Sequence, residues 1–232
     1  AIVDGNFRTE SVGVGGSLAR FAIKENTLIA INNGTTIKMF DIATPREISQ
    51  GDSINVWTTI ETLFTLDNNL FIGSTTGMFI YDITNPATPV LVSEYWHMTS
   101  CDPVVVEGDY AYVTLRTGTT CMGDINALHV IDISDISNPT LVKEYEMFNP
   151  HGLGIDNGTL FICDGTAGLK IYNASDPLTI TDNLIDTYSE IIPYDVIPYN
   201  GILILIAEDG LYQFDYSNPQ QIVMLSFLQI GN

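Results

Sequence analysis

Five segments of the chain share one pattern: an apolar strand that ends in Asp or Asn before a short polar turn. The residues that close these strands stand 41, 50, 41 and 42 positions apart: Asp41, Asp82, Asp132, Asn173 and Asp215. A further β-rich run follows each turn, and two more strands around a turn precede each segment. A period of about 40–50 residues that carries four strands is typical of a β-propeller blade.

The turn after each of these strands ends in a proline. The five prolines are Pro45, Pro86, Pro139, Pro177 and Pro219. Proline fixes φ and cannot extend a β-ladder, so it stops the strand pattern at this point. We expect the Asp or Asn side chain to accept a hydrogen bond from the backbone of the turn. Because these residues recur at strand ends and do not converge, a turn role is favoured over a ring of metal ligands.

An isolated four-stranded sheet with two apolar faces cannot bury both of them. A sheet that packs between two neighbours around an axis can. The repeat therefore predicts an all-β fold, a five-bladed β-propeller with four antiparallel strands per blade. One domain is expected over residues 17–232, with blades at about 17–57, 58–98, 99–147, 148–188 and 189–230. Residues 1–16 form either a lead-in segment or a strand that closes the last blade onto the first.

The composition fits a packed, strongly acidic domain. Apolar residues make up 45 % of the 232 residues and charged residues 16 %, and the net charge is −20. Such a charge repels nucleic acid and anionic lipid, so neither is an expected partner, whereas a cationic partner or Ca²⁺ is permitted. No apolar run reaches the roughly 18–20 residues of a membrane span. We therefore expect a soluble chain.

The turn at residues 132–139 (DISDISNP) and the apolar strands beside it, residues 128–132 and 141–145, resemble the LVIVD-repeat family of β-propellers. Residues 101–106 and 149–155 resemble family members found as secreted lipoproteins of Bacteroidetes-type bacteria. The resemblance covers nearly the whole chain, and only the array of motifs is specific. It implies a location in the cell envelope or outside the cell, with an outer-membrane lipoprotein as one form, and it brings no established catalytic residues.

The lipid-anchor cysteine expected in such lipoproteins is absent from this sequence. Contact with a membrane is therefore expected only through an anchor that the resemblance implies. No signal sequence is visible before the first predicted strand, so we expect a mature or trimmed form.

Three cysteines are too few for a disulfide scaffold. Cys163 lies in an apolar run and is expected to be a buried small hydrophobe. Cys101 and Cys121 fall at predicted loop ends of one repeat, and we predict that they form a disulfide, which would indicate an oxidising compartment. Cys121 lies in a long loop between Arg116 and Asn126. The disulfide would hold this loop at the mouth of the central channel, where function is often added to a repeated scaffold.

Polar residues gather where each innermost strand is expected to begin. The segments that lead into these strands share one face of a propeller with the loops between second and third strands. The candidate binding residues at this channel mouth are Arg20, Glu61, Asp102, Arg116, His151, Tyr194 and Asp195. Convergent polar groups at a concave mouth are the usual pattern of a binding site. The alternative is that they only solvate the channel and satisfy one another.

No HExxH, CxxC, P-loop, GxSxG or EF-hand spacing occurs, so no metal and no cofactor is predicted. The favoured function is an extracytoplasmic binding or scaffold module that recognises a glycan, a peptide or a partner protein through the channel mouth. An alternative is a glycoside-active enzyme with Glu61, Asp102 and Asp195 as carboxylates around the channel. A third is structural assembly through blade edges. Trp57 and Trp96 mark an aromatic boundary where packing is favoured over sugar stacking.

Overall fold

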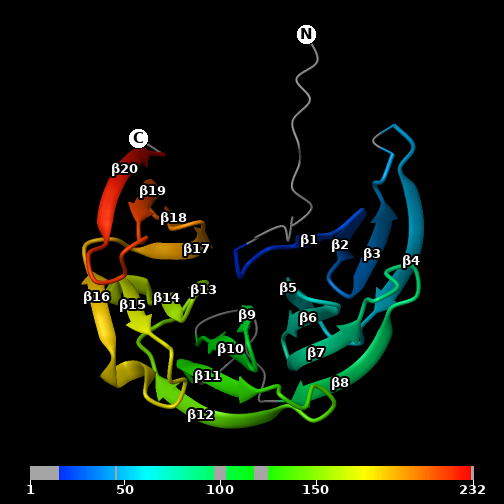
Figure 1. Cartoon of the computed structure of the whole chain (residues 1–232), viewed down its shortest axis with the longest axis horizontal. Helices are drawn as coiled ribbons and strands as arrows, with labels where there is room; N and C mark the ends of the chain where they lie inside the picture. Colours follow the sequence, from blue (N-terminus) through cyan, green and yellow to red (C-terminus); the bar gives the residue numbers. More distant parts are fainter. Residues whose placement is uncertain (1–15, 45, 97–102, 118–124, 231–232) are drawn as a thin grey trace.

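The computed structural model of this protein describes residues 16–44, 46–96, 103–117 and 125–230. These residues form five four-stranded antiparallel sheets arranged around a central axis (Figure 1). The prediction of an all-β, five-bladed β-propeller with four antiparallel strands per blade is confirmed. The helices among the described residues are two short 3₁₀ turns, η1 (Gly165–Ala167) and η2 (Ile180–Asp182). None of the described helices is long and apolar enough to cross a membrane.

Each blade consists of four consecutive strands. Blade 1 contains β1 (Phe21–Lys24), β2 (Thr27–Asn33), β3 (Thr36–Asp41) and β4 (Ser49–Asn55). Blade 2 contains β5 (Ile60–Leu66), β6 (Asn69–Ser74), β7 (Gly77–Asp82) and β8 (Val90–Trp96). Blade 3 contains β9 (Val104–Glu107), β10 (Tyr110–Leu115), β11 (Ala127–Asp132) and β12 (Thr140–Glu146). Blade 4 contains β13 (Leu153–Asp156), β14 (Thr159–Cys163), β15 (Leu169–Asn173) and β16 (Leu184–Tyr188). Blade 5 contains β17 (Pro193–Tyr199), β18 (Ile202–Ala207), β19 (Gly210–Asp215) and β20 (Val223–Gln229).

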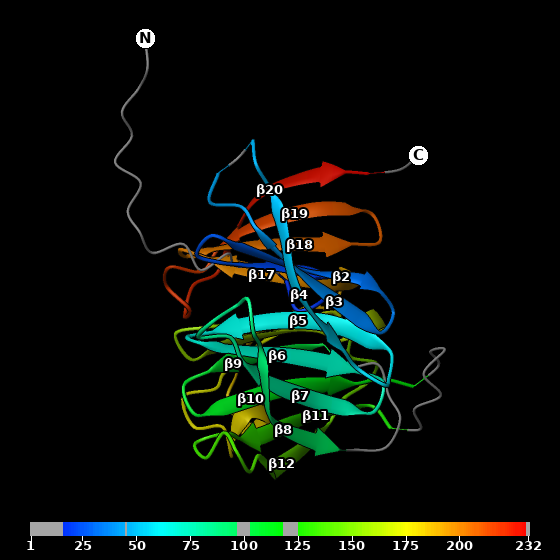
Figure 2. The same cartoon turned by 90° about the vertical axis from the view of Figure 1, so that its right-hand side faces the viewer.

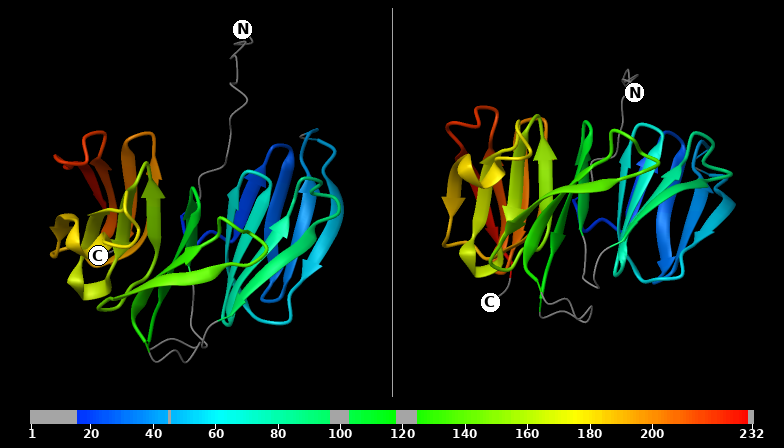
Figure 3. Two further views of the ribbon diagram at one scale, coloured as in Figure 1. Left: turned by 60° about the horizontal axis from the view of Figure 1, so that its bottom comes forward. Right: turned by 90° about the horizontal axis from the view of Figure 1, so that it is seen from below.

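The first strand of every blade lies nearest the axis and the fourth lies at the rim (Figure 1). Views from the side show that the connecting loops gather at the two ends of the blades (Figures 2 and 3). One end carries the segments that lead into the inner strands and the loops that join second to third strands. We call this end the mouth face. It includes residues 17–20, 56–60, 75–76, 116–117 and 147–152.

The Asp and Asn residues that close the third strands stabilise the turns that follow. Each side-chain oxygen accepts a hydrogen bond from the backbone N–H two residues later, at 2.7–2.9 Å: Asp41 from Ala43, Asp82 from Thr84, Asp132 from Ser134, Asn173 from Ser175 and Asp215 from Ser217. Hydrogen bonds from the hydroxyls of the same turns, and then these backbone bonds, lower the pKa of Asp82, Asp132 and Asp215. The turn role predicted from the sequence is confirmed.

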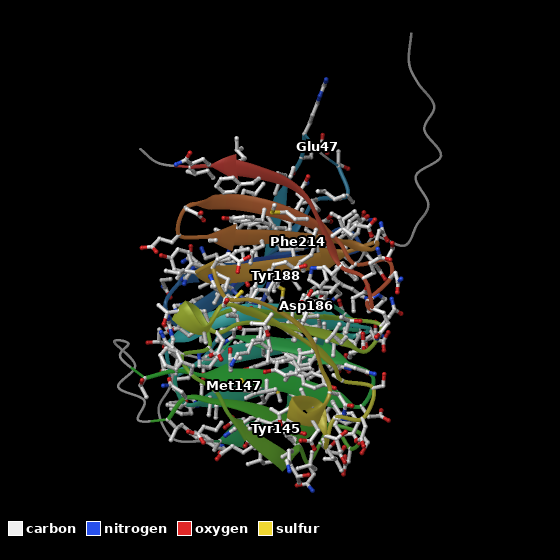
Figure 4. All side chains as sticks on the ribbon, turned by 90° about the vertical axis from the view of Figure 1, so that its left-hand side faces the viewer. Glu47, Tyr145, Met147, Asp186, Tyr188 and Phe214 are labelled. Carbon is white, nitrogen blue, oxygen red and sulfur yellow. The ribbon has the colours of Figure 1, made fainter. Side chains whose placement is uncertain are left out.

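Neighbouring blades are joined by apolar cores that bury the facing sides of two sheets. Four such cores connect blades 1 and 2, 2 and 3, 3 and 4, and 4 and 5. Figure 4 shows Tyr188 and Phe214 lying close together at the junction of blades 4 and 5, where their ring centroids are 4.8 Å apart. Cys163 is fully buried in the same core, as the sequence predicted. Among the described residues no fifth core joins blade 5 to blade 1.

The two end blades differ from the inner blades in how their second strands are covered. In blades 2, 3 and 4 nearly every residue of β6, β10 and β14 is buried, so both sheet faces are packed. In blade 5 the buried residues of β18 alternate with partly or fully exposed ones, and in blade 1 Ile29 is the one buried residue of β2. Alternation along a strand means that only one sheet face is covered. Figure 1 shows these two blades standing apart at the top of the view.

Two phenylalanines on different faces test this account of the core. Phe161 is completely buried between blades 4 and 5, whereas Phe40, on the uncovered face of blade 1, is only partly buried. Phe161→Ala should lower the free energy of unfolding by about 3–5 kcal/mol because it leaves a cavity. Phe40→Ala should cost roughly 1 kcal/mol, because solvent already reaches the side chain. Urea unfolding of both variants measures the difference, and equal losses would contradict the description of blade 1.

Candidate functional site

Arg116, His151 and Tyr194 come together on the mouth face from blades 3, 4 and 5. Nη1 of Arg116 lies 2.6 Å from Nδ1 and 3.0 Å from Nε2 of His151. The rings of His151 and Tyr194 are 5.9 Å apart between centroids and inclined at 46°. Arg116 and His151 are partly buried, and Tyr194 is 39 % exposed. The structure therefore unites a cation, an imidazole and a phenol where solvent can reach them.

The backbone around His151 is tied to two blades. Its N–H donates to the carbonyl of Cys163 at 2.6 Å, and its carbonyl accepts from Oγ1 of Thr114 in blade 3 at 2.6 Å. The Asn149 amide nitrogen lies 3.4 Å from Nε2 of the imidazole. These contacts fix the histidine at the junction of blades 3 and 4.

A buried carboxylate organises the segment before His151. Oδ1 of Asp164, which is fully buried, accepts hydrogen bonds from the backbone N–H groups of Phe148 at 3.0 Å and Asn149 at 2.8 Å. Its Oδ2 pairs with Nζ of Lys170 at 2.6 Å. A buried charge that is paired and hydrogen-bonded in this way holds its neighbours in one geometry. Asp164 therefore positions the loop that carries His151.

Electrostatics keep His151 neutral. Burial, and then the positive charge of Arg116, lower the pKa of His151 to about 4, against a smaller opposite effect of Asp164. Burial also lowers the pKa of Arg116, and the nearby Glu61 carboxylate opposes that shift. At neutral pH the imidazole is therefore uncharged, and the guanidinium donates to its unprotonated nitrogen. The cluster presents hydrogen-bonding groups and a partly balanced cation.

Glu61 and Tyr194 occupy matching irregularities in two inner strands. The pairing of β5 with β6 shifts between Ile60 and Thr62, and that of β17 with β18 shifts between Pro193 and Asp195. The bulged residue in each case is the one between, Glu61 or Tyr194. A β-bulge re-aims a side chain and is common beside functional sites. Because of these bulges, neither side chain follows the regular alternation of its strand between the two faces of the sheet.

Asp195 follows Tyr194 in β17 and binds the segment that leads into blade 1. We call Arg116, His151 and Tyr194 the mouth cluster. Oδ1 of Asp195 accepts a 3.0 Å hydrogen bond from the hydroxyl of Ser17, and Oδ2 accepts from the N–H of Leu18 at 3.4 Å. The same Ser17 hydroxyl accepts from the N–H of Leu153 in blade 4 at 2.7 Å. Both carboxylate oxygens are engaged internally. Asp195 therefore joins blade 5 to the segment that leads into blade 1.

Two glycines make room for this carboxylate. A Cβ at Gly16 or at Gly152 would lie only 2.2 Å from an oxygen of Asp195. Burial raises the pKa of Asp195 to about 6, although the hydrogen bonds from Ser17, Val196 and Leu18 oppose the shift. The lead-in segment, residues 16–18, is thus fastened to blade 5 by a carboxyl group with a pKa of about 6, and to blade 4 by the Ser17 hydroxyl.

The remaining sequence candidates are placed differently. Arg20 is exposed just before β1. Asp102 lies outside the described residues, and so do Cys101 and Cys121, whose disulfide stays a prediction. No group of three or more His, Cys, Asp or Glu side chains in the described part of the chain is arranged to hold a metal ion.

An exposed pair of tryptophans lies on the mouth face between blades 1 and 2. Trp57 and Trp96 stack at 4.7 Å between centroids with an interplanar angle of 17°. The edge-on ring of Phe79 supports both indoles, at 5.9 Å from Trp57 and 6.5 Å from Trp96. Trp57 is 59 % and Trp96 56 % exposed. The protein therefore covers less than half of the surface of each tryptophan.

Hydroxyl groups flank this tryptophan pair. The hydroxyls of Thr58 and Thr75 are 2.8 Å apart, and they lie in the two loops next to the indoles. The buried hydroxyl of Thr76 makes no hydrogen bond within the described part of the chain. Aromatic faces beside hydroxyl donors and acceptors are suited to a ligand with an apolar face and a polar edge.

Sequence reasoning did not single out Thr114, Asn149 or Ser17 as contributors to the mouth, and it placed Asp164 in a mouth loop without a role. Their roles depend on contacts between blades, such as the 2.7 Å bond that links Ser17 to a residue 136 positions away. The order of residues within one repeat contains no signal of such contacts. The stacked tryptophans were visible as an aromatic boundary, but their exposure was not.

The titration of His151 tests the electrostatics of the mouth. Arg116→Gln should raise the pKa of His151 from about 4, because the neighbouring positive charge is removed. The pKa should stay below the ordinary value of 6.5, because burial, the larger cause, remains. NMR titration of the imidazole resonances measures the shift. Lys143→Gln, an exposed lysine in blade 3, serves as the control, and the same His151 pKa in both variants would refute the proposed coupling.

The pH dependence of stability tests the role of Asp195. Its folded-state pKa of about 6 lies above the unfolded value near 3.8, so its contribution to stability is fully present below pH 4 and is lost as pH rises through 6. Two pKa units correspond to at most about 3 kcal/mol. Asp195→Asn should remove this loss, making the variant more stable than the wild type at pH 7.5. Urea unfolding at pH 4 and 7.5 measures it, with the exposed Asp52→Asn as control. A variant less stable than the wild type at both pH values would contradict the assignment.

Comparison with solved structures gives propellers of low sequence identity. A protein from Lactobacillus plantarum matches with a TM-score of 0.72 and 13 % identity, over 90 % of this chain and 71 % of its own. The periplasmic gluconolactonase PpgL of Pseudomonas aeruginosa matches with a TM-score of 0.67 and 12 % identity, over 89 % and 68 %. The computationally designed protein Ika8 matches with 0.61 and 14 %, over 90 % and 60 %. The chain therefore spans 60–71 % of the length of these structures, which share its fold.

No match is found among curated proteins. The sequence profile of the LVIVD repeat matches residues 66–96 and 100–147, in blades 2 and 3. The chain thus contains LVIVD repeats in a five-bladed β-propeller, in agreement with the repeat family that its turns resemble.

Proposed function

We propose that this protein is a binding module that recognises a neutral glycan through its mouth face. The observation that carries the proposal is the stacked pair Trp57 and Trp96, which leaves more than half of each side chain exposed. The C–H face of a sugar ring can stack on an indole, while its hydroxyl groups bond to neighbouring polar side chains. The hydroxyls of Thr58 and Thr75, which lie 2.8 Å apart in the loops beside the indoles, are such polar groups.

The mouth cluster of Arg116, His151 and Tyr194 lies on the same face and would contact a longer chain of sugars. Its imidazole is neutral and its guanidinium is partly balanced by Glu61, so it offers hydrogen bonds without a strong local charge. The net charge of −20 disfavours acidic polysaccharides. Both features support an uncharged ligand.

The resemblance to secreted propellers supports a location in the cell envelope or outside the cell, where glycans are abundant. A peptide or a partner protein that uses the same face is the other reading of a scaffold with exposed aromatic residues.

A glycan array with the full chain tests the proposal. We expect binding to neutral glycans, and Trp57→Ala and Trp96→Ala should each weaken the affinity about tenfold or more, because exposed aromatic anchors carry much of such binding. His151→Ala should weaken only longer oligosaccharides. Tyr199→Ala, which removes an aromatic ring that is 54 % exposed at the opposite end of blade 5, is the control.

Failure to bind any neutral glycan would remove the proposal. Binding that survives both tryptophan substitutions would move the site away from the indole pair. Affinities measured by titration calorimetry on the best glycan decide between these outcomes.

A further inference from the structure

Blade 5 has one apolar face that no other sheet covers. In β18 the residues Leu203 and Leu205 are fully buried against blade 4, whereas Ile206, which points to the other side, is 44 % exposed. By the pairing of β17, β18 and β19, the uncovered face carries Asp195, Gln213 and Asp215 together with six apolar side chains: Ile197, Tyr199, Ile202, Ile204, Ile206 and Leu211. All six are partly or fully exposed. We call this surface the open face of blade 5.

The same positions in blade 4 form a packed interface. Aligned on their first turns, Phe161 and Cys163 of β14 correspond to Ile204 and Ile206 of β18. Phe161 and Cys163 are 0 % exposed because blade 5 covers them. The open face of blade 5 therefore has the register of a face that receives a following blade, with isoleucines at these two positions and Gln213 where blade 4 has the buried Ile171.

Blade 1 leaves the opposite face uncovered. Its Ile29 and Met39 are buried against blade 2, while Leu28, Ala30 and Phe40 turn to the other side and remain partly exposed. In blade 4 the positions of Leu28 and Ala30 are occupied by Leu160 and Ile162, which blade 3 buries completely. Phe21, on the same side of β1, is 62 % exposed. We call this surface the open face of blade 1.

We propose that the open faces of blades 5 and 1 are docking surfaces for further blades, that is, four-stranded antiparallel sheets with two apolar faces, which complete the ring. The proposal continues an interface that occurs four times within the chain. Each open face repeats one half of that interface, and a blade inserted next to each would cover it in the same register.

The solved structures support this occupant over a direct contact between blades 5 and 1. About 90 % of this chain superposes on only 60–71 % of longer propellers. The remaining 29–40 % of each longer structure has no counterpart in this chain. A fold of this kind therefore has room for further sheets beside the five described here, and docking them leaves the four closely packed cores undisturbed.

Extended versions of the chain test the proposal. The full chain is compared with versions that continue after Asn232 with a second copy of residues 148–188, or of residues 99–188. At least one extension should raise the midpoint of thermal unfolding, by on the order of 5 °C. Ile204→Asp and Leu28→Asp, placed on the two open faces, should lower the midpoint of the original chain by only about 2–4 °C, because solvent already reaches both side chains, and should lower that of the stabilised extended chain by clearly more. Leu178→Asp, in an exposed loop of blade 4, should change neither.

Three results would overturn the proposal. Both extensions could leave the midpoint of thermal unfolding unchanged, and Ile204→Asp could lower that midpoint equally with and without an extension. The unextended chain could be monomeric by light scattering and lose as much stability as the extended chain with each open-face substitution, which would mean that blades 5 and 1 pack on one another. It could also form dimers that either substitution dissociates, which would identify a second copy as the occupant.

Discussion

Every sheet in this protein has two apolar faces, and the rest of the structure follows from the need to cover them. Within blades 2, 3 and 4 the second strand is buried on both sides, so these sheets are stable only between neighbours. Strand twist rotates each sheet relative to the next, and the row of sheets bends around an axis. The inner strands β1, β5, β9, β13 and β17 are then brought side by side.

That convergence creates the mouth face from residues that are far apart in sequence. Arg116, His151 and Tyr194 meet because three inner blade ends meet, and the backbone bonds around His151 reach into blades 3 and 5. Apolar packing thus sets the positions, and a few polar contacts such as those of Asp164 refine them. The position of the tryptophan pair depends on the same geometry, because Trp57 packs on Trp96 and on Phe79 at the mouth end of the core between blades 1 and 2.

The number of blades, the strand order and the turn role of residues such as Asp132 could be predicted from the sequence, because each depends on a pattern that recurs within one repeat. The grouping of His151 with Arg116 and Tyr194 followed from aligning the repeats. The inward role of Asp195 could not be predicted, since it depends on Ser17 and on glycines that leave space for the carboxylate. The bulges at Glu61 and Tyr194 depend on strand register, which alternation alone does not specify. The uncovered end faces were not foreseen either, because Ile204 and Leu28 belong to the same apolar pattern as their buried counterparts.

The construction of each sheet from four consecutive strands also bears on how the molecule forms. Each strand pairs only with the strand before or after it in the chain, so contacts within a sheet are local and each sheet can assemble soon after its own residues leave the ribosome. A nascent blade then finds its predecessor already in place as a template for docking. No described sheet has to wait for a strand from the other terminus, so growth proceeds in one direction along the polypeptide, like that of a solenoid.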